Sequence, residues 1–308
     1  MGSLVGHVAP GLGFFFIGIW HLLNHIKLHA LHPKSYTSLS WFPTPKIRYL
    51  ELFLIIFGTI ISISMELFIG PEKHQPLDID GTIPSNHLRS FEHSNISLTF
   101  FVYALFSIIF DNVTLSPQIQ YGLTQFLASI AFGQEFLLFH LHSTDHMGVE
   151  GQYHWLLQII IFVTLVTTLL GIPFPNSFLN SFVRSYSIIF QGIWFMVTGI
   201  MIWTPEFIPK GCVLKSDDGH EVVTCHNIEA LERAKSLINI EFSWYLVGVT
   251  IFVISIYLVL IKNIYPEKID YQFLASKFED EKGLEDVEAQ EKSQIDKKFV
   301  EMEKLFSL

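Results

Sequence analysis

The chain has 308 residues, of which 50% are hydrophobic and only 16% are charged, and its formal net charge is −10. Soluble domains carry about 25% charged residues, whereas the mean hydropathy here is +0.41. These values exclude an ordinary soluble domain, and the acidic balance gives no support to nucleic-acid binding.

Seven segments are long and apolar enough to cross a bilayer, which requires about 20 predominantly apolar residues in a helix. They are expected at residues 8–28, 47–69, 88–110, 119–141, 152–172, 178–202 and 237–261. Proline, glycine and asparagine separate them, as is typical of connecting loops. The sequence therefore predicts an all-α fold, a polytopic membrane protein built as a bundle of seven transmembrane helices.

Two further features accompany the bundle. Between the sixth and seventh segments, Cys212 and Cys225 bracket two β-prone runs around an Asp218-Gly219 turn, which predicts a short extramembrane hairpin. The hairpin would bring the cysteines within disulfide reach, and the alternative is a pair of reduced thiols. Beyond residue 265 the chain is highly charged, so we expect a transmembrane domain at 1–265 and a charged cytoplasmic tail at 266–308, helical or disordered.

Lysine and arginine counts near the segment ends, with Arg184 among them, slightly favour a cytoplasmic C-terminus and an N-terminus outside. In this orientation the cysteine-containing loop lies outside the cytosol, where disulfides form. The acceptor sequence at Asn112 would lie in the cytosol and stay unglycosylated.

Ionisable side chains gather where the fourth segment ends and the fifth begins, and others converge on the same end of the bundle. Such groups at membrane depth are costly and usually face a bundle interior, a partner or an ion. Mixed imidazole and carboxylate ligands favour a divalent metal ion, zinc first, with iron as an alternative. The candidate ligands are Glu66, His93, Glu135, His140, His142, His146, Glu150 and His154.

Histidine and glutamate also serve metal-free proton relays and pH-sensing networks, so that alternative remains open. A second histidine stripe, His21, His25, His29 and His32, ends the first segment. We interpret it as an interfacial amphipathic end, where imidazoles and Lys27 meet lipid headgroups.

Three separated motifs occur in order: GHVAPGLGFFFIGIW, EFLLFHLHSTDHMGVEGQYHWLL and QGIWFMVTG. Together they resemble the transmembrane protein 45 family (domain of unknown function 716), which includes plant virus-response-like membrane proteins. The resemblance implies a multi-pass protein with seven spans in the plasma membrane or endomembranes, a stress-response role in the plant members, and no established reaction. The family's polar block falls on Glu135, His140, His142, Glu150 and His154.

Two classes of function follow. The first is a metal-binding protein that acts as a metal-dependent enzyme on lipid, with Glu135 or Glu150 as the general base if it is not a ligand; no residue is assigned as catalytic. The second is a non-enzymatic transporter, receptor or trafficking protein with a proton-sensing polar network. The expected partners are the lipid bilayer and a lipid or small-molecule ligand.

Overall fold

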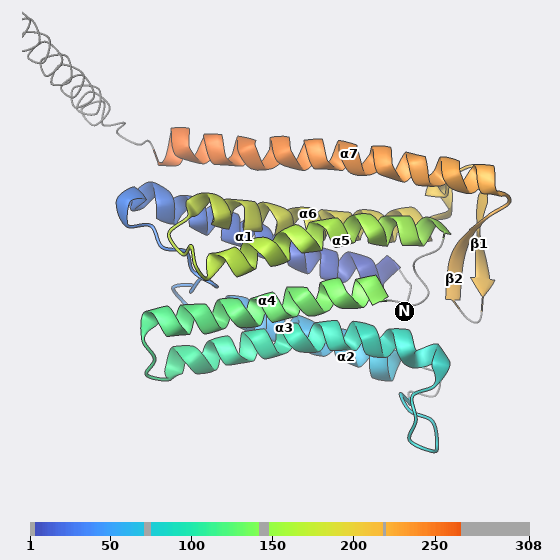
Figure 1. Cartoon of the computed structure of the whole chain (residues 1–308), viewed down its shortest axis with the longest axis horizontal. Coiled ribbons are helices and arrows are strands. Elements are labelled where there is room, and N and C mark those ends of the chain that lie inside the picture. The colour runs from blue at the N-terminus through green and yellow to red at the C-terminus, as the bar shows by residue number, and fades with distance from the viewer. Residues whose placement is uncertain (1–3, 71–74, 142–147, 218–219, 266–308) are drawn as a thin grey trace, which may run out of the picture. The chain divides into compact units, whose positions relative to one another are not determined.

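The computed structural model describes residues 4–70, 75–141, 148–217 and 220–265 (Figure 1). The chain divides into two units, Met1–Tyr265 and Pro266–Leu308, and every element described below belongs to the first. The charged tail lies outside the described residues, so its helical or disordered state remains a prediction.

Seven helices of the described chain are long and apolar enough to cross a membrane, which confirms the predicted all-α, seven-span fold. They are α1 (Leu4–Leu31), α2 (Leu50–Ser64), α3 (Leu88–Asn112), α4 (Pro117–Leu141), α5 (Gly148–Gly171), α6 (Phe178–Trp203) and α7 (Ile228–Val259). The short helical turns are η1 (Pro33–Ser35), η2 (Met65–Ile69), η4 (Ser85–His87), η5 (Pro205–Phe207) and η6 (Leu260–Ile264). Of these, η2 continues α2 and η6 continues α7.

The seventh helix differs from its prediction, because it begins at Ile228 and not near residue 237. Asn227 caps it, since the side-chain oxygen accepts a hydrogen bond of 2.8 Å from the backbone N–H of Ala230. Such a cap satisfies one of the free donors of the first turn. The helix therefore extends beyond the apolar run that identified it.

The helices pack in the order α2, α3, α4, α5, α6, α1, and α7 lies against α5 and α6 (Figure 1). Because consecutive helices run antiparallel, the starts of α1, α3, α5 and α7 share one end of the bundle with the ends of α2, α4 and α6. The two strands lie at this end, which we call the hairpin end. The other end, where the chain between α1 and α2 lies, is the opposite end.

A seam of glycines joins α1 and α6. Gly11 and Gly18 on α1 face α6, and Gly192 and Gly199 on α6 face α1, with a seven-residue spacing in each helix. A Cβ atom at Gly11 would lie 2.8 Å from the backbone oxygen of Gly192, and one at Gly199 would lie 2.8 Å from Cβ of His7. Small residues let membrane helices approach at backbone distance, where van der Waals contact is the main attraction. This close approach fixes the start of α1, with His7, against the end of α6.

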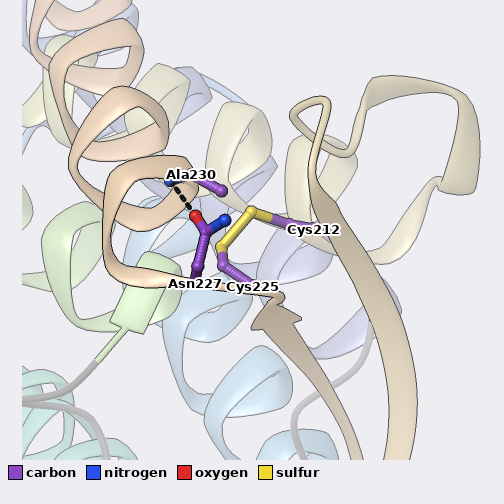
Figure 2. Close-up of a disulfide and its surroundings, with 4 residues drawn as sticks. All are labelled: Cys212, Cys225, Asn227 and Ala230. Carbon is purple, nitrogen blue, oxygen red and sulfur yellow. Dashed lines mark hydrogen bonds between the residues drawn. A yellow bond between two sulfur atoms is a disulfide. The ribbon is translucent and has the colours of Figure 1, made fainter.

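The predicted hairpin and disulfide are both confirmed. Strands β1 (Cys212–Asp217) and β2 (His220–Cys225) pair antiparallel, and Cys212 lies directly opposite Cys225. A disulfide joins these two cysteines just before the Asn227 cap (Figure 2). Cys212 and Val223 are buried in the main core, so the base of the hairpin packs on the bundle.

Candidate functional site: polar pairs at the hairpin end

The structure brings two of the described candidate ligands, Glu66 and His93, together, and it gives Glu135, His140 and His154 other partners. Among residues 4–70, 75–141, 148–217 and 220–265, no group of three or more His, Cys, Asp or Glu side chains is placed to hold a metal ion. His142 and His146 lie outside these ranges, so their predicted ligand role is not tested by the structure.

The closest imidazole pair joins α1 to α5. The Nε2 atoms of His7 and His154 are 3.3 Å apart, and the two rings stack with an interplanar angle of 15°. Both side chains are buried, with 6% and 3% of their surface exposed. The indole of Trp203 covers His7 at a centroid distance of 4.6 Å, which shields the pair from the surface. Glu150, one helical turn before His154 on α5, is buried as well.

His7 was not among the predicted ligands. It precedes His154 by 147 residues, so no local spacing connects them. The alternating direction of the helices already predicts that His7 and His154 lie at one end of the bundle, but it does not specify which side chains meet there.

A second pair joins the end of α2 to the start of α3. The Oε1 atom of Glu66, in the π-helical turn η2, lies 3.4 Å from Nδ1 of His93. Both residues were candidate ligands, and the structure makes them partners of each other. π-Helical turns frequently occur at functional sites, so the residues of η2 should be left unchanged in variants of the hairpin end.

Glu135 and His140, the candidates on α4, bond glutamine side chains. The fully buried Glu135 accepts a hydrogen bond of 2.8 Å from Nε2 of Gln191 on α6. Nδ1 of His140 lies 3.3 Å from Oε1 of Gln158 on α5, whose amide also donates to the backbone oxygen of Phe139. The two candidates thus connect α4 with α6 and with α5 separately.

Residues 121–258 match the model of a family described as a family of unknown function, DUF716. This stretch is similar to that family. The match confirms the resemblance seen in the sequence, and it begins within α4 and ends within α7. The DUF716 stretch contains Glu135, His140, Glu150 and His154, whereas His7 and Glu66 lie before it.

A second polar network occupies the opposite end of the bundle. The carboxylate of Glu51 on α2 accepts hydrogen bonds from Nε1 of Trp20 at 3.0 Å and from the backbone N–H of Phe42 at 2.8 Å, and it lies 2.7 Å from Nε2 of His21. His21 and His25 are both buried within the protein. The interpretation of these two histidines as interfacial is therefore wrong, because the segment between α1 and α2 folds over them.

Arg184 of the DUF716 stretch lies at the centre of this end. Only 4% of its surface is exposed. Its guanidinium donates to Oε1 of Gln125 at 2.9 Å, to the backbone oxygen of Leu39 at 3.2 Å and to Nε2 of His25 at 3.3 Å. Arg184 was counted above among the cations near the segment ends, but it is buried in the bundle and is not exposed at a membrane surface.

The arginine also fixes the tautomer of His25. A guanidinium only donates, so Nε2 of His25 accepts, and the ring proton is on Nδ1. Nδ1 lies 2.9 Å from the hydroxyl of Tyr36, which accepts that proton as a hydrogen bond. Burial raises the pKa of the Tyr36 phenol to about 12, so Tyr36 is neutral at physiological pH.

Proposed function

We propose that this multi-pass membrane protein binds a divalent metal ion, zinc first, at the hairpin end, with His7 and His154 as two of its ligands. The separation of 3.3 Å between their Nε2 atoms is the observation that supports this. Two nitrogen ligands about 2.0–2.1 Å from one tetrahedral zinc lie about 3.3–3.4 Å apart. The pair thus has the spacing of two ligands of one ion.

Further ligands would come from α5 and from the chain before it. Glu150 is buried one turn from His154, and His142 and His146 lie in the sequence between α4 and α5. We propose that one of these three supplies the third ligand. Glu66, His93, Glu135 and His140 stay outside this ligand set, because each bonds a side chain elsewhere in the bundle.

A metal held by three protein ligands keeps a fourth position for water, whose pKa the metal lowers toward 7. This is the chemistry of a hydrolase, and the bilayer makes lipid esters and amides the natural substrate class. His7 and His154 would hold the ion at a fixed depth. Glu135, already bonded to Gln191, would lie one helical turn or more deeper in the bundle than the ion.

The second candidate is a metal-free, proton-sensing network. The same 3.3 Å also suits a hydrogen bond between two neutral imidazoles, and Glu66 with His93 forms an ion pair when the histidine is protonated. Such a network belongs to a transporter, receptor or trafficking protein and needs no enzyme activity.

Metal content distinguishes the two candidates. We expect about one metal ion per chain in the detergent-purified wild type, by inductively coupled plasma mass spectrometry, and its loss in the double variant His7→Ala, His154→Ala. His226→Ala is the matched control, because His226 is an exposed histidine at the same end. Since ligands must be deprotonated, acidification below the imidazole range, about pH 6, should release the ion.

Thermal stability gives a second readout. A metal that bridges α1 and α5 stabilises the folded state by mass action, so a chelator should lower the melting temperature of the wild type and leave that of the double variant unchanged. If the wild type carries no stoichiometric metal, and chelation leaves its melting temperature unchanged, the metal proposal fails and the proton-sensing network replaces it.

We also propose that the hairpin end faces an oxidising compartment, across the plasma membrane or an endomembrane, with the C-terminus in the cytoplasm. The support is the Cys212–Cys225 disulfide, since such bonds persist outside the reducing cytosol. Without Arg184, the excess of lysine and arginine on the predicted cytoplasmic side becomes smaller. The proposed orientation therefore depends more on the disulfide.

A further inference from the structure

A groove of about 760 Å³ opens between α7 and the pair α5 and α6, toward the hairpin end. Its walls are almost entirely apolar. Ile193 and Met201 come from α6, Phe207 from η5, and Val249 and Phe252 from α7. Ligand pockets commonly have volumes of about 300–1,000 Å³, so the groove is large enough for a small amphiphile.

One polar pair interrupts this apolar lining. The hydroxyl of Tyr153 on α5 donates a hydrogen bond of 2.8 Å to Oε2 of Glu241 on α7. No other hydrogen bond to the Glu241 carboxylate is made within the described part of the chain. The carboxylate thus keeps acceptor capacity that faces the groove.

The groove opens on an exposed apolar surface of α7, as expected of a surface that faces lipid. Trp244, next to Glu241 in the helix, is 73% exposed, and Val247 and Ile251 are also largely exposed. Glu241 lies near the start of the apolar part of α7, at the level where tryptophans and lipid headgroups meet. From Glu241 to Phe252 the helix rises roughly 16 Å at about 1.5 Å per residue, which gives an acyl chain an apolar path into the bilayer.

We infer that this groove binds a single-chain amphiphile whose headgroup donates hydrogen bonds to Glu241, through an amine or a hydroxyl. The chain of the ligand lies along α7, and the headgroup meets the Tyr153–Glu241 pair. A carboxylate attracts donors, most strongly cationic ones, and disfavours anionic headgroups. The inference does not rest on the proposed metal site, and its test needs no metal.

Gly248 allows the groove to be closed by a single substitution. A Cβ atom at Gly248 meets no atom within 4 Å, so a side chain can start there without a clash at Cβ, and Gly248→Leu would place its branched end in the groove. Gly58 on α2 is equally open and lies outside the groove, so Gly58→Leu is the matched control. The probe is stearylamine with a photoactivatable diazirine in its chain, added to the detergent-purified full chain and mapped by peptide mass spectrometry.

We expect labelling of α7 residues around the groove in the wild type and in Gly58→Leu, and at least a tenfold reduction in Gly248→Leu. Unlabelled stearylamine and stearyl alcohol should compete for this labelling, whereas stearic acid should not. In Glu241→Gln the advantage of the amine over the alcohol should disappear.

Two results would overturn the inference. Equal labelling in Gly248→Leu and Gly58→Leu would mean that the probe samples the general lipid-facing surface. A dimer in native mass spectrometry that Gly248→Leu disrupts would mean that a second copy of the chain covers the groove.

Discussion

Arg184 places a guanidinium inside the bundle, where a charged side chain is expensive unless its donors are satisfied. Its described acceptors are an amide oxygen of Gln125, a backbone oxygen of Leu39 and a ring nitrogen of His25, which come from α4, the α1–α2 connection and α1. One side chain of α6 thereby bonds three segments that are distant in sequence. Arginine suits this position because its donors point in several fixed directions.

Replacing this arginine should destabilise the protein. In Arg184→Met the acceptors on Gln125, Leu39 and His25 lose their donor, and each acceptor that is left buried and unsatisfied costs about 1–3 kcal/mol. We expect a melting temperature lowered by several degrees, measured by tryptophan fluorescence in detergent. Arg48→Met is the control, since Arg48 pairs with Asp111 at the surface and should change stability little. Equal melting temperatures for the two variants would show that Arg184 is not a structural centre.

At the level of elements, the contact between α1 and α6 depends on the absence of side chains along the glycine seam. Gly18 faces Ile189 at a distance that leaves no room for a Cβ atom, which would lie 2.7 Å from Cγ1 of Ile189. Hydrophobic attraction between helices is weak in lipid, so close backbone packing of this kind is what holds such a pair together.

Filling the seam should separate the two helices. Gly192→Leu would drive its side chain into the backbone of α1, and overpacking typically costs about 1–3 kcal/mol or more. Gly13→Leu, on α1 but facing open space, should be tolerated. Yield after size-exclusion chromatography and melting temperature are the measurements, and a Gly192→Leu variant as stable as Gly13→Leu would contradict the role of the seam.

For the whole molecule, the two ends of the bundle should face different compartments. The hairpin already contains Thr224, and Val222→Asn completes a glycosylation acceptor with it. Expressed in a eukaryotic cell, this variant should shift in mobility upon glycosidase treatment, whereas the wild type should not. Asn112, the natural acceptor site, lies at the opposite end, where its amide bonds the hydroxyl of Tyr49.

A glycosidase shift in the wild type that Asn112→Gln removes would invert this orientation. Val222→Asn would then stay unmodified, and the proposed metal site would face the cytosol. The two variants therefore give opposite results in the two orientations.

The spans and the hairpin could be predicted because each is specified by local sequence. An apolar run of bilayer length is recognisable in the sequence alone, and Cys212 and Cys225 bracket two β-prone runs joined by a turn. The pairing of His7 with His154 could not be predicted in the same way, because it depends on which helices are neighbours. The burial of Arg184 could not be predicted for a related reason. In the sequence, a cation near the start of an apolar segment resembles a charge that flanks it, and only the packing of α1, α4 and the α1–α2 connection around Arg184 shows that it is enclosed.

The glycine seam joins a helix inside the family match to a helix outside it. The DUF716 stretch contains α6, in which 72% of the residues of an 18-residue stretch are buried, the highest share among the seven spans. It does not contain α1, against which the glycines of α6 pack. A fragment trimmed to residues 121–258 would expose to lipid a notched helix face shaped for a missing neighbour. The matched stretch is therefore smaller than the packed unit, and we expect a fragment that includes α1 to fold better than residues 121–258 alone.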